Sequence, residues 1–574
     1  MENLLPKIIE SLIVIAIQSF VLQILVSYFK FSTSKLIDKC RKVYSTYSGK
    51  ILVFMVMFLL SMYIIHIISN RESATFVNAA SLATFEYIIF VASCCILGIA
   101  FILDLLIMSR RKTFAKTMES YEYKRWLVDT LRTIYPGWQV VGGDDKEEGV
   151  EYASCILNIK EDFKWVAEGL DENIGDNLIL PYTDASLKCE KEYLDKNNQK
   201  IAKRKFLKRY AFFDFSLGFR AFIYRVQYYL LVRNTVRFPD LIGYALDEFI
   251  YEGSDPMTIT INGVNCSLTT YFHNVMTSHI MEYELYRAYL KHPNSVAELD
   301  ELPYRKSVHR TVYKKLHPKS DEEPKLISED MTKAVFTMGC GRYSLLSVQA
   351  LIVYKESNTY KTFMYNRGDK VAIYKNHKQI APAGGFELYE RSRKVFSLDS
   401  IRAGFDPEYA LAREVLEELF GIEDFDGNSE DQKCALVRDT VYAQGPIKVL
   451  KNESNKYDGQ YWCQLCTNTL DVVYLRHVLS YIIVINHCDF YKDFTNDGYK
   501  LNLNEREFDR RNDMPISKLS NIFQKHNMSL PDTAGLVRYF LDSDIRKALE
   551  ECEHSNKDVK FEEVLNRIKQ SKMN

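Results

Sequence analysis

The sequence predicts N-terminal transmembrane α-helices followed by a cytoplasmic α/β region. Residues 1–112 contain three long apolar segments, whereas the rest of the chain alternates amphipathic helical patterns with short β-branched and aromatic runs. A chain of 574 residues also exceeds one ordinary core, so several domains are expected. We predict a membrane anchor over 1–112, an α+β linker domain over 113–330, a further α/β domain over 331–550 and a charged helix or tail over 551–574.

Three apolar segments near the N-terminus have the length of transmembrane helices. Residues 51–69 and 87–108 are mostly apolar over about 20 positions, the length that crosses a bilayer core. Residues 11–29 are long enough but include Gln18 and Gln23. They are therefore either a third span or an amphipathic helix at the membrane surface.

Basic residues determine the predicted orientation. Segment 30–50 carries six Lys or Arg residues and one Asp, whereas segment 70–86 carries a single Arg. By the positive-inside rule, the first loop and the chain after residue 109 are cytoplasmic. A multi-pass membrane protein with a cytoplasmic C-terminal region is the expectation.

Composition argues against two classes of protein. Lys and Arg number 74 against 75 Asp and Glu, a formal net charge of −1, so no duplex nucleic-acid partner is expected. The 12 cysteines lack the regular spacing of a disulfide framework, which favours a reducing compartment. Cys463 and Cys466 have the spacing of zinc ligands, but no second pair accompanies them, so ordinary strand thiols are the alternative.

The linker segment mixes helical patterns over 121–134, 240–251 and 271–290 with polar turns. The run from Lys203 to Arg233 interleaves basic and aromatic residues. This composition is typical of single-stranded nucleic-acid binding or of anionic lipid binding, and equally of a buried aromatic segment with a solvated basic edge.

After residue 330 the pattern changes to strands and then to a carboxylate-rich helix. Strands are predicted over 347–355, 361–367 and 371–376. Asp406 is the expected N-cap and Pro407 the first residue of the helix. Further along it, Glu414, Glu417 and Glu418 are spaced to share one face. Such a face either binds a divalent cation, Mg²⁺ above all, or is simply solvated.

This region resembles the Nudix family, whose signature is G-x5-E-x7-R-E-U-x-E-E-x-G-U with U aliphatic. The matching residues are Gly384, Glu390, Arg413, Glu414, Val415, Glu417, Glu418, Gly421 and Ile422. The later segments also resemble the end of a Nudix fold, with a strand over 481–486, the segment 514–523 and a closing helix over 529–540. The resemblance implies that the α/β region ends in a divergent Nudix-like α/β/α sandwich over 331–550.

The resemblance also implies the roles of the matching residues. Glu417 and Glu418 would be ligands of Mg²⁺, and Glu414 would be a further ligand or the catalytic base. Arg413 would act in catalysis as an orienting partner, and Gly384, Gly385 and Arg413 would contact the ligand. The sequence departs from the pattern in two places. Arg413 lies 23 residues after Glu390, where the pattern places it eight residues after, and one extra residue precedes Gly421. These departures favour a ligand sensor over an efficient hydrolase.

A membrane anchor joined to such a domain resembles the CD-NTase-associated membrane-anchored Nudix effectors of bacterial CBASS antiphage systems. The resemblance implies an inner-membrane protein that senses a cyclic oligonucleotide made by a partner CD-NTase, forms homo-oligomers and disrupts the lipid membrane, causing abortive infection. The alternatives are a membrane-bound, Mg²⁺-dependent Nudix hydrolase of a nucleoside diphosphate derivative and a structural scaffold that binds no ligand.

Overall fold

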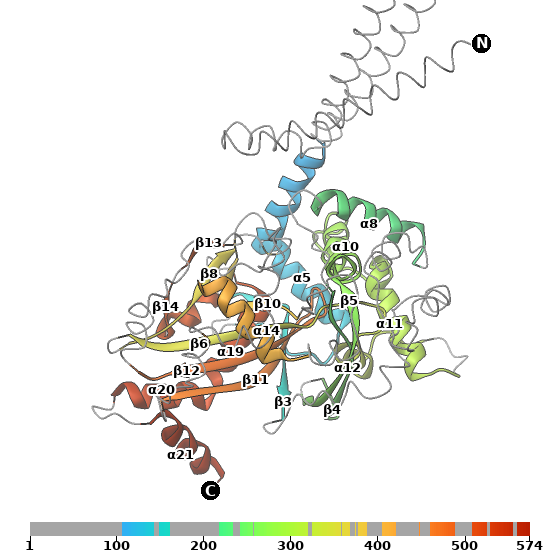
Figure 1. Ribbon diagram of the computed structural model, residues 1–574. Coiled ribbons are helices and arrows are strands. Elements are labelled where there is room, and N and C mark those ends of the chain that lie inside the picture. Colours follow the sequence, from blue (N-terminus) through green and yellow to red (C-terminus); the bar gives the residue numbers. More distant parts are fainter. Residues whose placement is uncertain are drawn as a thin grey trace, which may run out of the picture. The chain divides into compact units, whose positions relative to one another are not determined.

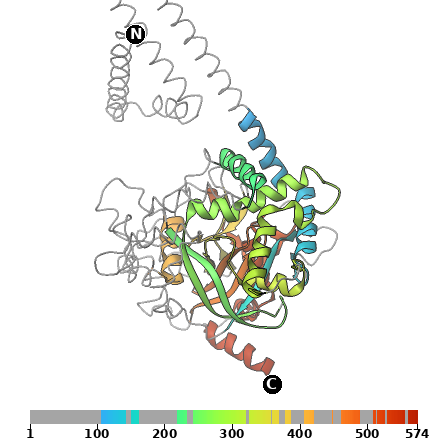
Figure 2. The ribbon, with the colours of Figure 1, turned by 90° about the vertical axis from the view of Figure 1, so that its right-hand side faces the viewer.

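The computed structural model divides the chain into two compact units, Met1–Ala115 and Lys116–Asn574. Figures 1 and 2 show the described residues as coloured ribbons in two views a quarter-turn apart. The fold presented below is that of the described part of Lys116–Asn574. The structure describes residues 106–142, 149–160, 217–232, 242–256, 258–319, 324–356, 359–367, 374, 377–386, 405–420, 447, 460–487, 508–511, 513–524, 529–554 and 560–573.

The predicted fold class requires correction at its N-terminal part. Among the described residues, no helix is both long and apolar enough to cross a membrane. The helices named below have at most 14 residues, short of the ~20 that a span needs. This finding contradicts the predicted transmembrane helices and the predicted multi-pass inner-membrane localisation. Of the three predicted spans, 11–29 and 51–69 lie outside the described residues, as does 87–108 as far as residue 105.

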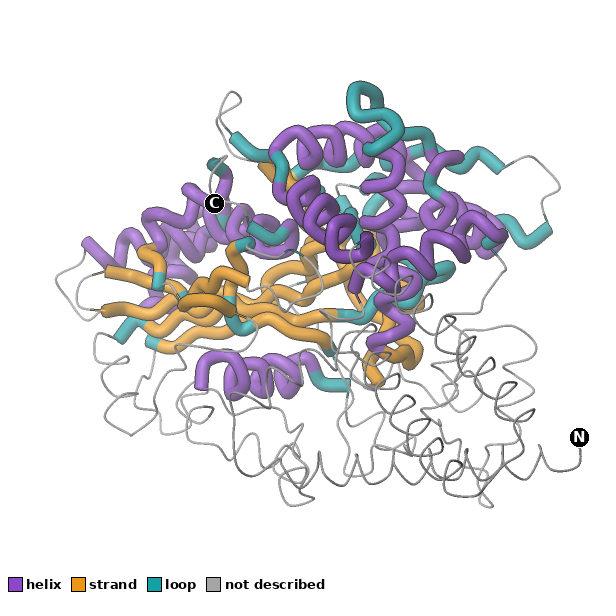
Figure 3. Tube along the Cα trace, turned by 90° about the horizontal axis from the view of Figure 1, so that it is seen from above, coloured by secondary structure: helices purple, strands orange, loops and turns teal. Residues whose placement is uncertain are grey.

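The main sheet is mixed and takes strands from both sides of residue 330. β6 runs parallel to β12 and β3 runs parallel to β5, whereas the other neighbours are antiparallel. Figure 3 shows helices on both sides of these strands. The strand order is β14 (Met514–Pro515), β7 (Thr359–Thr362), β6 (Ser347–Glu356), β12 (Arg476–Ile485), β11 (Tyr461–Asp471), β3 (Ser154–Ile159), β5 (Thr260–Thr270) and β4 (Ile242–Glu252), and β10 (Ala383–Gly385) also pairs with β6.

Two small sheets accompany the main sheet. One pairs β1 (Val141–Gly142) with β2 (Glu151–Tyr152), and the other has the order β13 (Phe508–Arg511), β8 (Met364–Arg367), β9 (Lys378–Ile380). The helices are α5 (Tyr121–Ile134), α8 (Phe219–Val232), α9 (Tyr271–Asn274), η4 (Val275–His279), α10 (Ile280–Tyr289), η5 (Leu299–Glu301), α11 (Pro303–Leu316), α12 (Glu329–Thr337), α14 (Pro407–Glu414), η6 (Val415–Leu419), η7 (Ile516–Phe523), α19 (Pro531–Asp542), α20 (Asp544–His554) and α21 (Phe561–Met573).

Helix α5 confirms the helix predicted over 121–134. The Ser120 hydroxyl accepts a hydrogen bond from the Tyr123 amide at 3.2 Å, which satisfies one of the amides left without a partner at a helix start. Apolar residues recur three to four positions apart and are buried, among them Trp126, Leu127 and Leu131. This spacing places them on one face, which packs into the molecule.

The helix predicted over 240–251 is wrong, because these residues form strand β4. β4 pairs antiparallel with β5 along its length. On its other edge, the Gly339 amide donates to the Asp247 carbonyl at 2.9 Å and the Leu346 amide to the Tyr244 carbonyl at 2.8 Å. Backbone pairing with distant segments therefore determines the conformation of these residues, although their local sequence pattern fits a helix.

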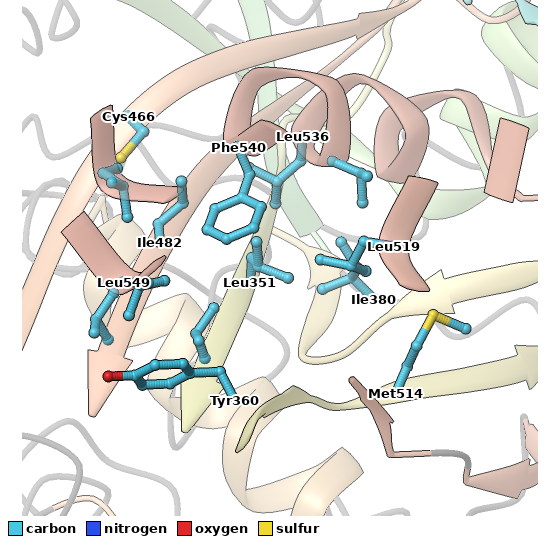
Figure 4. Close-up of a cluster of buried hydrophobic side chains, with 14 of the residues drawn as sticks. Leu351, Tyr360, Ile380, Cys466, Ile482, Met514, Leu519, Leu536, Phe540 and Leu549 are labelled. Atoms are coloured by element: carbon cyan, nitrogen blue, oxygen red, sulfur yellow. The ribbon is translucent and has the colours of Figure 1, made fainter. Parts of the chain in front are cut away.

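A buried apolar cluster joins one face of the sheet to the C-terminal helices. Figure 4 shows Leu536 and Phe540 of α19 beside Leu351 of β6 and Ile482 of β12. All four side chains are fully buried. Burial of a side chain of this size stabilises a fold by roughly 1.5–3 kcal/mol, so the cluster makes a large contribution to holding α19 on the sheet.

The turn between β11 and β12 is held by buried side chains from other segments. We call residues 472–475 the 472–475 turn. Arg305 of α11 donates to its first carbonyl at 3.1 Å and also to its second. Ser278 donates to the third at 2.6 Å, and Arg342 donates to the fourth at 3.2 Å. Each carbonyl of the turn thus has a buried donor, as the interior requires.

Candidate functional site

Strand β10 carries the first two residues of the predicted site, Gly384 and Gly385. It pairs with the start of β6, where Gly384 lies opposite Val348 and Gly385 opposite Ser347. The preceding Ala381–Pro382 peptide bond is cis. The two glycines therefore lie on an ordered strand beside the parallel β6–β12 pair.

Helix α14 begins where the sequence predicts. The Asp406 carboxylate accepts from the Tyr409 amide at 3.1 Å, and Pro407 is the first helical residue. Figure 1 shows α14 beside the sheet, and the helix packs against β10 and β6. Its buried residues include Tyr409, Ala410 and Leu411. This packing brings the end of α14 to the glycines of β10.

The structure brings together Gly384, Arg413 and Glu414. A Cβ atom at Gly384 would lie only 2.0–2.3 Å from the Glu414 carboxyl group, so this carboxylate lies directly over the glycine. The Arg413 guanidinium contacts it, with 3.1 Å between Arg413 Nη2 and Glu414 Oε1. Both side chains are buried, with exposed fractions of 2% for Arg413 and 8% for Glu414.

Glu418 lies on the same side of the site but has a different partner. Its Oε2 accepts from the Ala383 amide at 2.9 Å, and its backbone carbonyl accepts from the Tyr365 hydroxyl at 3.1 Å. Glu418 is buried, whereas Glu417 is half-buried. The three glutamates therefore differ in environment, although their sequence spacing predicts a common face.

The physical reason for this difference is the π-helical turn η6, which spans Val415–Leu419. A π turn closes hydrogen bonds between residues i and i+5, so it holds one residue more than an α-helical turn. The sequence exceeds the Nudix pattern by one residue directly before Gly421. Glu417 and Glu418 lie in this π-helical turn, whereas Glu414 is the last residue of α14, so the three glutamates do not follow one regular α-helix.

Glu414, Glu417 and Glu418 are the predicted ligands of Mg²⁺. Within the described part of the chain, no three His, Cys, Asp or Glu side chains are grouped so as to hold a metal ion. Glu414 and Glu418 are engaged with Arg413 and the Ala383 amide instead. Magnesium binding stays a prediction, and the function proposed below depends on no metal.

The remaining predicted residues are either elsewhere or outside the described chain. Glu390, Gly421 and Ile422 lie outside it. Cys463 and Cys466 both lie on β11, where Cys463 is exposed and Cys466 is buried. Neither thiol belongs to a metal-binding group among the residues that the structure describes.

Sequence reasoning missed the partners of the glutamates. The Ala383 donor is a backbone amide and carries no residue-type signal. Tyr365 lies in a predicted strand, but nothing in the pattern indicates that its hydroxyl reaches η6. The pairing of β10 with β6 positions the Ala383 amide, and the pairing of β8 with β9 and β13 positions Tyr365.

Fold and site together define an α/β protein with a mixed sheet and a buried arginine–carboxylate site between a glycine strand and a π-helical turn. No known protein family, curated protein or solved structure matches the chain. The resemblance to the Nudix and CBASS proteins therefore stays a prediction from the motif.

Proposed function

We propose that this chain is a sensor that binds a cyclic oligonucleotide at the arginine–carboxylate site and serves in antiphage defence. One observation carries the proposal: Glu414 and Glu418 already have protein partners in a buried site. Carboxylates with protein partners fix the shape of a binding site, whereas metal-assisted hydrolysis requires them to bind a metal ion.

Arg413 is the group that we assign to ligand recognition. A guanidinium offers several N–H donors in a planar fork that matches a phosphate group. Its present anionic partner is the Glu414 carboxylate, at 3.1 Å. A phosphate of the ligand would compete with Glu414 for these donors, so binding would change the contact between α14 and β10.

The class of ligand and the defence role come from the motif-based resemblance to CBASS effectors. That resemblance also implies a CD-NTase partner that makes the ligand, and assembly of the chain into homo-oligomers when the ligand binds. Membrane disruption is not part of the proposal, because the predicted anchor is contradicted.

Binding and turnover measured on the same full-length protein test the proposal. Calorimetric titration with a panel of cyclic di- and trinucleotides is expected to give saturable binding to one of them, and light scattering is expected to show a larger assembly. The same ligand is expected to be recovered intact after incubation. Arg413→Lys keeps the charge but not the fork geometry, and we expect it to weaken binding about tenfold or more.

The matched control is Glu417→Gln, which alters the half-buried carboxylate. A sensor is expected to keep its affinity in this variant. If the protein instead hydrolyses a nucleoside diphosphate sugar with Mg²⁺, and Glu417→Gln abolishes that hydrolysis, the hydrolase alternative is correct. If no nucleotide binds to the folded protein, the alternative of a structural scaffold is correct.

A further inference from the structure

A short side-chain contact joins the β8–β9 hairpin to α5. The Lys124 Nζ and the His377 Nε2 are 2.8 Å apart. His377 is buried just before β9, and Lys124 is half-buried in α5. The two residues are 253 positions apart in sequence, so this contact connects two distant segments of the chain.

A contact of this length between two nitrogen atoms depends on the number of protons that the pair holds. A hydrogen bond needs one donor and one acceptor. An ammonium group has no acceptor, and an imidazolium ring has none either. The Lys124–His377 contact is therefore maintained while the pair carries at most one positive charge, and it is lost when both groups are protonated.

The groups around Lys124 reinforce this dependence. Burial lowers the pKa of Lys124 to about 7, against the opposing effect of Glu119 and Glu282. Burial also raises the pKa of Glu282, on α10, to about 7. Acidification below neutral pH thus neutralises Glu282 near Lys124. The closed contact then lacks a nearby anion that would stabilise a second positive charge on the pair.

The groups on the hairpin side act in the same direction. The Tyr374 hydroxyl donates to the Asp471 carboxylate at 2.9 Å, and burial raises the pKa of Asp471 to about 7. Arg476 pairs with Asp532 of α19 at 2.5 Å and keeps its charge throughout this range. Acidification therefore leaves this side more positive.

Two further charged or titratable groups among the described residues belong to these surroundings. His279 of η4 stays neutral, because burial and the nearby Arg476 and Arg367 lower its pKa to about 3. Arg367 of β8 stays charged. Neither group supplies the negative charge that a doubly protonated Lys124–His377 pair would require.

The hairpin is also connected to the arginine–carboxylate site. The Arg367 amide donates to the His377 carbonyl at 2.9 Å, and its guanidinium donates to the Gln379 side chain. Gln379 in turn donates to the Ala383 carbonyl at 3.4 Å. The Ala383 amide is the donor to Glu418 at 2.9 Å, so a continuous set of contacts runs from His377 to the site.

We propose that the Lys124–His377 contact is a proton-sensitive latch that fixes the β8–β9 hairpin to α5 and so positions Ala383 and Glu418. The latch is closed at neutral and higher pH. Acidification opens it and loosens the hairpin, including its link to β10. This inference goes beyond the proposed function and does not depend on any ligand.

Amide hydrogen exchange on the full-length protein at about pH 8 and about pH 5.5 tests the latch, because a free histidine titrates between these values. After correction for the intrinsic pH dependence of exchange, peptides covering 364–367, 378–386 and 121–134 are expected to exchange about tenfold faster at the lower pH. Peptides of α19 report whether the fold is intact.

Two variants give opposite expectations. His377→Gln keeps a side-chain acceptor for Lys124 but does not titrate, so exchange in the hairpin is expected to stay slow at both pH values. Lys124→Met removes the donor, so exchange is expected to be fast at both. A general folding defect would not produce both results.

A matched control removes a histidine that lies elsewhere. His292 pairs with Glu301 at 3.0 Å on the surface, and His292→Gln is expected to keep the pH dependence of the wild type. The proposal is overturned if His377→Gln shows the same acid-induced rise as the wild type, or if Lys124→Met leaves exchange slow at both pH values.

Discussion

At Gly384 the absence of a side chain is what allows the Glu414 carboxylate to lie against β10. The carboxyl atoms occupy the space that a Cβ atom would need, at 2.0–2.3 Å. Glu414 is also held by the buried Arg413. The position of the carboxylate thus depends on a hydrogen atom at Gly384, which gives a physical reason for glycine here.

We expect Gly384→Ala to destabilise the protein by about 1–3 kcal/mol, the usual cost of inserting an atom into a packed site. Urea unfolding of the full chain measures the change in midpoint. Gly142→Ala is the control, because the nearest atom to its Cβ would be Glu151 Cγ at 3.3 Å. Its effect is expected to be within about 0.5 kcal/mol, and equal midpoints for the two variants would contradict the assignment.

The predictability of the site differs from residue to residue. The motif assigns Gly384 and Glu414 to one predicted site, and in the structure the Glu414 carboxylate lies against Gly384. It does not predict the burial of Arg413 or the engagement of Glu418 with a backbone amide. Those properties come from packing between segments, and a pattern of residue types along one segment does not contain them.

Among the elements, α14 and η6 form one helical segment with two kinds of turn. The start of α14 is set locally, by the Asp406 side chain and by Pro407. Its end passes directly into the π-helical turn η6. Local signals therefore predict where this helix begins, but not how its glutamates are directed.

Asp406→Ala is expected to destabilise α14 by about 0.5–2 kcal/mol, because the Tyr409 amide loses its acceptor. Hydrogen exchange of peptides covering 407–414 measures this as a loss of protection confined to the helix. Asp406→Asn keeps an acceptor oxygen and is expected to retain most of the protection. Equal loss in the two variants would show that charge rather than capping is responsible.

Other elements show where sequence patterns are sufficient. The helix predicted over 121–134 and the strand over 347–355 are confirmed as α5 and β6, and the helix over 529–540 is confirmed as α19. The strand predicted over 361–367 is confirmed as two shorter strands, β7 and β8. The prediction of a helix over 240–251 was wrong, because β4 forms its backbone hydrogen bonds with β5 and with the amides of Gly339 and Leu346.

At the scale of the whole molecule, buried carboxyl groups give stability a pH dependence. Burial raises the pKa of both Glu282 and Asp471 to about 7. In the unfolded chain these groups lose their protons near pH ~4. Between these values the folded state binds more protons at these two groups, so their contribution to the free energy of unfolding decreases as the pH rises to about 7. Buried histidines such as His279, whose pKa burial lowers to about 3, contribute with the opposite sign.

Glu282→Gln and Asp471→Asn are each expected to flatten this decrease, because a side-chain amide does not titrate. Urea unfolding at a series of pH values from about 5 to about 7 measures the slope. The contribution of these two carboxyl groups is opposite in sign to the effect of acid on the latch, so the two effects are separable. An unchanged slope in both variants would mean that other groups cause the dependence.

The continuity of the sheet across residue 330 predicts how fragments behave. β11 pairs with β12 on one side and with β3 on the other, so a fragment of residues 331–574 would lose β3 and expose an edge of β11. We expect this fragment to aggregate and residues 116–574 to fold, as measured by light scattering and circular dichroism. A folded, monomeric 331–574 fragment would contradict this expectation.

The 472–475 turn also bears on the order in which the chain acquires its structure during synthesis. Arg305, Ser278 and Arg342 emerge from the ribosome long before the carbonyls that they hold. Synthesis proceeds from the N-terminus, and contacts between distant segments form slowly. The two arginines therefore remain hydrated until more than 130 further residues have been made. The segments that carry them are consequently expected to bind chaperones until β11 and β12 have been made.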